Sequence, residues 1–102
     1  MDLSMKNKNF KINVLGEKYK LNFEELNGHG IEGLCQPAKK IISLDKSLEK
    51  RPDDLQVTLI HEIGHCIFHE SSLCQAIGHD IEEVIVDLFG KVLTKNFKLI
   101  PK

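Results

Sequence analysis

The sequence has no excess of either charge and no long run of apolar residues. Its 102 residues include 14 lysines and arginines and 15 aspartates and glutamates, which gives a formal net charge of −1. Charges of both signs are spread along the chain, so we expect no basic surface for nucleic acid or for an anionic membrane. A membrane-spanning helix needs about 18 or more apolar residues in a row, and no segment has them. We therefore expect neither nucleic acid nor a membrane as a partner.

Cysteine is also scarce. The three cysteines, Cys35, Cys66 and Cys74, are an odd number and form no C-x-x-C pair, which favours reduced thiols over a disulfide framework. The lysines of the N-terminal stretch MDLSMKNKNFK are followed by no apolar run, so we expect no signal peptide. These features favour a soluble, cytoplasmic protein, and the length predicts one domain over residues 1–102.

Residues 1–45 carry the two-residue period of half-buried strands. Apolar and polar side chains alternate over residues 10–14 and again over residues 19–23, which predicts two strands joined by a tight hairpin. Residues 39–45 predict a third strand. Between the second and third strands the chain is rich in glycine, and we expect at most a short strand near Leu34.

Two long helices are predicted in the second half of the chain. Pro52 and the two aspartates that follow it suit a first helical turn, so we expect a helix over residues 53–69. A second helix is expected over residues 80–95. Strands followed by helices predict an α+β fold, with a small antiparallel sheet of about three strands and then two packed helices.

The stretch HEIGH in the first predicted helix is the strongest chemical signal. His61 and His65 lie one helical turn apart on the same face, so both imidazoles can reach one cation. Glu62 lies at the edge of that polar stripe, where the H-E-x-x-H motif has its general base. The rest of the helix is apolar almost all round, which predicts a buried helix. Gly64 in its middle predicts that a neighbouring backbone passes close by.

A catalytic zinc site needs a third protein ligand, and the second predicted helix offers three carboxylates. Periodicity favours Glu82, which projects between apolar residues and would be the costly buried acid. Glu83 shares a polar stripe with Asp87 and also fits a helix-capping role to Asp80. The residues alone therefore leave both glutamates open as the third ligand.

HEIGH followed by EEVIVDLFG resembles the pattern of the gluzincins, the thermolysin-type zinc peptidases, in which a second helix carries N-E-x-x-S-D-x-F-G. The resemblance covers about residues 57–93. Two positions depart from the pattern, because Glu82 replaces the asparagine and Val86 replaces the serine. The strand-rich first half and the small size are more similar to minimal metallopeptidases of phage and prophage origin and to ImmA/IrrE-type regulatory peptidases.

The resemblance implies a role for each polar residue of the two motifs. His61, His65 and Glu83 would bind Zn²⁺. Glu62 would be the catalytic general base. Asp87 would orient His61 through the ring nitrogen that does not face the metal.

The implied function is that of a zinc metalloendopeptidase acting on a protein or peptide substrate, with regulatory proteolysis of a protein partner as one use. The alternative is a catalytically silent zinc-binding interaction module; no oligomeric state is predicted. By the same resemblance, the strand at 41–44 would lie at the cleft edge and pair with an extended substrate. The second helix would approach the first at Gly90 and pack its apolar face against the sheet. Weaker candidates for stabilising an oxyanion are Tyr19, His29 and His79, for which core packing or solvent exposure is the alternative.

Overall fold

The computed structural model describes residues 11–26, 28 and 30–97. Phe10, expected in the first strand, and His29 lie outside these residues. The described elements are, in order, β1 (Lys11–Val14), β2 (Glu17–Glu24), β3 (Gly33–Gln36), β4 (Ile41–Asp45), the 3-10 helix η3 (Lys46–Lys50), α1 (Pro52–Glu70), α2 (Leu73–Ile77) and α3 (His79–Asn96). The fold is α+β, as predicted. None of the helices in this part of the chain is long and apolar enough to cross a membrane.

The sheet differs from the predicted antiparallel sheet of three strands. In the described part of the chain, four strands form a mixed sheet in the order β1-β2-β4-β3. β2 and β4 run parallel, whereas the β1–β2 and β3–β4 pairs are antiparallel. The reason is that β3 lies beyond β4, so the chain must return through a turn at residues 37–40 and β4 runs in the direction of β2. β4 is the most buried strand, which suits the centre of a sheet.

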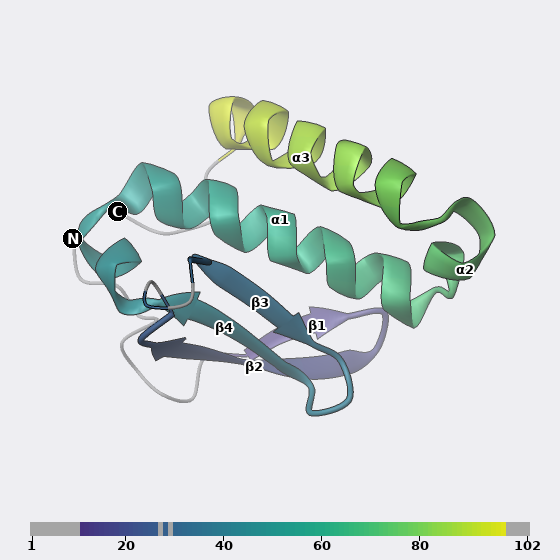
Figure 1. Ribbon diagram of the computed structural model, residues 1–102, viewed down its shortest axis with the longest axis horizontal. Coiled ribbons are helices and arrows are strands. Elements are labelled where there is room, and N and C mark those ends of the chain that lie inside the picture. The colour runs from purple at the N-terminus through teal and green to yellow at the C-terminus, as the bar shows by residue number, and fades with distance from the viewer. Residues whose placement is uncertain (1–10, 27, 29, 98–102) are drawn as a thin grey trace.

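α1 lies between the sheet and α3 (Figure 1). Pro52 stands in its first turn, and no residue from Leu55 to Cys66 is exposed. Leu55, Leu59 and Cys66 join the core formed with β2 and β4. The prediction of a buried helix is therefore confirmed, and the helix that carries HEIGH is held from two sides.

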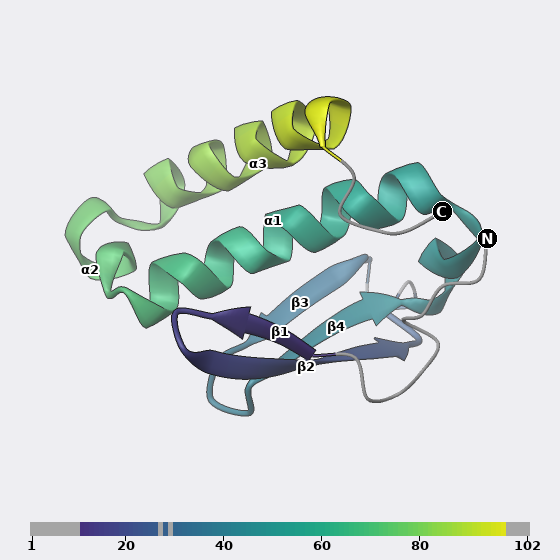
Figure 2. The ribbon, with the colours of Figure 1, turned by 180° about the vertical axis from the view of Figure 1, so that it is seen from behind.

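The prediction that α3 packs against the sheet is wrong. It lies on the side of α1 that faces away from the strands, so the layers are sheet, α1 and α3 (Figures 1 and 2). Glycines allow the close approach of the two helices. A Cβ added to Gly64 would lie 2.6 Å from Cγ1 of Val86, and one added to Gly90 would lie 3.2 Å from the carbonyl oxygen of Val57. The close approach expected at Gly90 is thus found against backbone, whereas at Gly64 the nearest neighbour is the Val86 side chain, with the Cα of Val86 at 3.7 Å. The apolar outer face of α3 is left exposed.

Candidate metal centre

Three of the predicted site residues meet between α1 and α3. The Nε2 atoms of His61 and His65 are 3.2 Å apart. Glu83 of α3 lies against both of them, with Oε1 3.4 Å from His61 Nε2 and Oε2 3.1 Å from His65 Nε2. In the described part of the chain, these three residues form the one group of histidine, cysteine and acidic side chains close enough to hold a metal ion.

The donor atoms are close enough to share one zinc ion. Ligands bound at roughly 2.0–2.1 Å in a tetrahedron are about 3.3 to 3.4 Å apart. The two Nε2 atoms, 3.2 Å apart, are close to that separation, and each also has one oxygen of Glu83 at 3.1 or 3.4 Å. The two imidazoles face different oxygens of that carboxylate; with one ligand atom taken from each residue, the three atoms lie within 4.8 Å of one another. Two imidazoles and one carboxylate are also a donor set that zinc uses in catalytic sites, where the fourth position stays open. The residues present therefore fit the metal that the motif implies.

Glu82 supports His65 from the side opposite Glu83. Its buried carboxylate contacts Nδ1 of His65. We therefore assign the proton to Nδ1, so that this N–H donates a hydrogen bond to Glu82. Nε2 then keeps its lone pair for a cation, an arrangement common in zinc sites. Of the two glutamates that periodicity left open, Glu83 reaches the metal-facing nitrogens and Glu82 lies behind one of them.

His61 is partly buried beside His65. Burial and the neighbouring His65 lower its pKa, an effect that Glu83 and Asp87 partly oppose. A lowered pKa favours the neutral imidazole, which is the form that binds metal.

Asp87 does not form the predicted contact with His61. Its carboxylate pairs with Lys91 one turn along α3, at 2.9 Å, and its side chain is half exposed. The reason is that Asp87 and Lys91 share the outer side of α3, where an i,i+4 pair forms readily. The supporting carboxylate in this structure is therefore Glu82 acting on His65.

Glu62 is enclosed between α1 and β3. It is 8 % exposed and accepts a hydrogen bond from the backbone N–H of Cys35. Burial raises the pKa of Glu62 to about 7, with Glu83 adding to the rise and His65 and the Cys35 N–H opposing it. β3 can pass so close because residue 33 is glycine, where a Cβ would lie 2.9 Å from Cγ of Glu62. The predicted base is thus placed by a strand that the sequence only hinted at.

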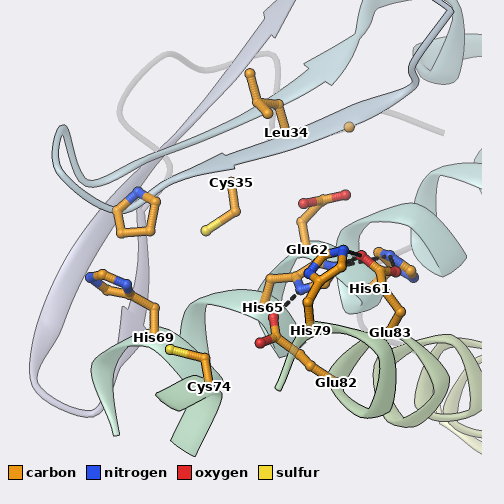
Figure 3. Close-up of a pocket in the computed structure, with 12 residues that line it drawn as sticks. Leu34, Cys35, His61, Glu62, His65, His69, Cys74, His79, Glu82 and Glu83 are labelled. Atoms are coloured by element: carbon orange, nitrogen blue, oxygen red, sulfur yellow. Dashed lines mark hydrogen bonds and ion pairs between the residues drawn. The ribbon is translucent and has the colours of Figure 1, made fainter. Parts of the chain in front are cut away.

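A pocket of about 450 Å³ opens between β3 and the helices and contains this centre (Figure 3). His69 of α1 and Cys74 of α2 line the end of the pocket away from His61. The wall opposite α1 is β3, an edge strand of the sheet. The prediction that the strand at 41–44 lies at the cleft edge is therefore wrong. That strand is β4, whose two edges are already paired with β2 and β3.

Of the three weaker candidates for stabilising an oxyanion, Tyr19 and His79 differ in where they lie relative to the pocket. Tyr19 is fully buried, and its hydroxyl donates a hydrogen bond to Glu70 at 2.6 Å. It therefore packs in the core, which was the alternative to a role in the site. His79 lines the pocket with an exposed side chain, and its Nε2 is 3.7 Å from Glu83 Oε2. His29 lies outside the described residues.

Sequence reasoning missed the contribution of β3. Gly33 and the N–H of Cys35 position Glu62, yet neither residue belongs to a recognisable motif. The glycines clustered between β2 and β4 were the available signal, since glycine allows a close approach of backbone. The spacing of the motif residues does not indicate which strand passes beside them. The motif indicated the candidate site residues, and their neighbours become known only from the fold.

Comparisons with known proteins add nothing to this geometry. The chain matches no model of a known protein family, no curated protein and no solved structure.

Proposed function

We propose that the chain is a zinc-dependent metallopeptidase that hydrolyses peptide bonds. His61, His65 and Glu83 would hold the metal, and Glu62 would act as general base. The observation that carries the proposal is the meeting of two imidazole Nε2 atoms, 3.2 Å apart, with the carboxylate of Glu83, beside the buried carboxylate of Glu62. The resemblance of the two motifs to the gluzincins supports the same reading. A cytoplasmic location belongs to the proposal, because the cysteine pattern suits a reducing compartment.

The roles of the residues follow from where they lie. Zinc, when bound, would supply a Lewis acid that polarises the scissile carbonyl and acidifies water. Glu62 would take a proton from the attacking water and deliver it to the leaving amine. The N–H of Cys35 and the close approach of Gly33 would hold its carboxylate in one place. Glu82 would keep Nδ1 of His65 protonated, which directs Nε2 to the metal.

The substrate that suits the pocket is an extended peptide. β3 is an edge strand and lines the pocket along its length. Main-chain groups at an exposed strand edge can pair with an added strand, which positions a peptide without strong demands on its side chains. We therefore expect cleavage within unfolded or extended segments of a protein.

Metal binding is tested by the zinc content of the purified protein. Wild type should hold about one zinc per chain, and Glu83→Ala should lose it. Glu82→Gln should retain a site whose zinc affinity is roughly 10- to 100-fold weaker, because it removes a supporting carboxylate. Glu25→Gln, an exposed carboxylate elsewhere, is the matched control and should bind as wild type. Zinc that survives Glu83→Ala but not Glu82→Gln would show that the ligand assignment is wrong.

Catalysis is tested with a library of unstructured peptides. Wild type should cleave members of the library, and Glu62→Gln should keep its zinc while losing cleavage by at least about a hundredfold. If both proteins hold zinc and are equally inert, the chain is a zinc-binding interaction module and the proposal of hydrolysis fails.

A further inference from the structure

The outer face of α3 carries a continuous apolar surface, which we call the outer stripe. Its members are each more than half exposed, and they are Ile81, Val84, Leu88, Phe89 and Val92. Their spacing of three and four residues places them on one side of the helix. Glu82, Val86 and Gly90 are buried on the opposite side, against α1. Within the part of the chain that the structure describes, the stripe is left uncovered because α3 lies on α1 and not on the sheet.

The size of the outer stripe marks it as an interaction surface. Its exposed apolar area is on the order of 500 Å², which is large for a surface that stays in contact with water. Two such surfaces in contact would bury about 1,000 Å², the lower limit for a specific interface. The stripe is thus large enough for a weak, reversible association.

The order of charges beside the stripe identifies the partner. Charged residues border it along the side of Val84, and in chain order they are Asp80, Asp87, Lys91 and Lys95. The sign changes from negative to positive along the helix. When two helices pair antiparallel, the same border of each faces the other in reverse order. A second copy of α3 would then bring Asp80 opposite Lys95, and Lys95 opposite Asp80.

We propose that the chain forms a two-fold symmetric dimer through the outer stripe, with the two α3 helices antiparallel and Leu88 near the symmetry axis. Such a self-complementary contact closes after two copies and needs no further surface. Glu83 faces away from the stripe, so both pockets stay open in the dimer. In a parallel two-fold pair the charged border of each helix would face the opposite, uncharged border of its partner, so the charge pairs would not form.

The association is tested by sedimentation of the full chain between about 5 and 500 µM. The mean mass should rise with concentration from 11.6 kDa towards twice that value. Leu88→Asp buries a charge at the axis and should raise the dissociation constant at least about tenfold. Leu15→Asp changes a leucine in the β1–β2 turn that is also more than half exposed, and this variant should associate as wild type. Circular dichroism of both variants should match that of the wild type.

The orientation is tested by reversing charges. Lys95→Glu and Asp80→Lys should each weaken association roughly three- to tenfold, since each creates two like-charge pairs in the antiparallel dimer. An equimolar mixture of the two variants should recover wild-type association. A wild-type chain that stays monomeric over the whole range, or a Leu88→Asp variant that associates as strongly as Leu15→Asp, would overturn the proposal and leave the stripe to a different partner.

Discussion

At the scale of single residues, the absence of one side chain decides where Glu62, the proposed general base, can lie. Gly33 lies where β3 passes close to α1. A Cβ there would lie 2.8 Å from Cγ2 of Thr58 and 3.0 Å from Oε2 of Glu62. Real Cβ atoms are essentially never found that close to other heavy atoms, so either the strand or Glu62 would have to move.

We predict that Gly33→Ala separates metal binding from catalysis. The metal ligands lie on α1 and α3 and should still bind zinc, whereas the displaced Glu62 should lower peptide cleavage by about tenfold or more. Overpacking should also reduce the free energy of unfolding by about 1–3 kcal/mol. Cleavage, zinc content and urea unfolding measure the three effects. Gly28→Ala is the control, since an added Cβ there meets nothing within 4 Å; equal cleavage by the two variants would contradict the role given to Gly33.

At the scale of elements, the distance between α1 and α3 sets the geometry of the metal centre. Gly64 lies one residue before His65, and Val86 lies one turn after Glu82 and three residues after Glu83. Contact between Gly64 and Val86 therefore fixes how far the carboxylates stand from the imidazoles. A change in this contact should be felt as a change in zinc affinity as well as in stability.

We predict that Gly64→Ala weakens zinc binding. The new methyl group would meet Cγ1 of Val86 at 2.6 Å and push α3 outward. Alanine favours a helix by about 1 kcal/mol over glycine, so the loss of stability should be smaller than the loss of zinc affinity suggests. Adding Val86→Ala removes Cγ1 and should restore much of the affinity. Zinc titrations of the two single variants and the double variant measure this, and a double variant no better than Gly64→Ala would argue against the contact.

The same scale shows what the sequence could and could not predict. Helices at 53–69 and 80–95 were expected, and α1 and α3 are each one residue longer at both ends. Helical periodicity and helix-start residues are features of the local sequence, so both helices could be recognised from the sequence alone. The parallel pairing of β2 with β4 and the outer position of α3 depend on which surfaces meet, so local patterns could not give them. Glu82 and Glu83 could not be told apart either, because adjacent residues on a helix both border its inner face.

At the scale of the whole molecule, Tyr19 ties the sheet to the end of α1. Its buried hydroxyl donates to Glu70, which also pairs with Lys40 before β4. Burial, and then the hydrogen bond to Glu70, raise the pKa of Tyr19 above its ordinary value of 10.0. A raised pKa means that folding favours the protonated phenol. The stability contributed by this group is therefore complete below pH 10 and is lost as the pH rises beyond it.

We predict that alkaline pH unfolds the protein through Tyr19. It is the sole tyrosine of the sequence, so the ultraviolet absorbance of tyrosinate reports on this group alone. In the folded protein the phenol should not ionise near pH 10, and the absorbance should rise only together with loss of the helical circular dichroism. In concentrated denaturant the same group should titrate near its ordinary pKa of about 10. Ionisation near pH 10 with the helix signal intact would contradict the prediction.

The enclosure of α1 also bears on how the chain can diverge. From Leu55 to Cys66 every residue of this helix is at least partly buried, and the same helix carries His61, Glu62 and His65 of the candidate site. Inherited substitutions there would disturb the packing of the core and the candidate site together, so few of them should be tolerated. Changes in what the pocket accepts would arise more readily from β3 and from the connection over residues 71–78, which border the pocket without forming the core.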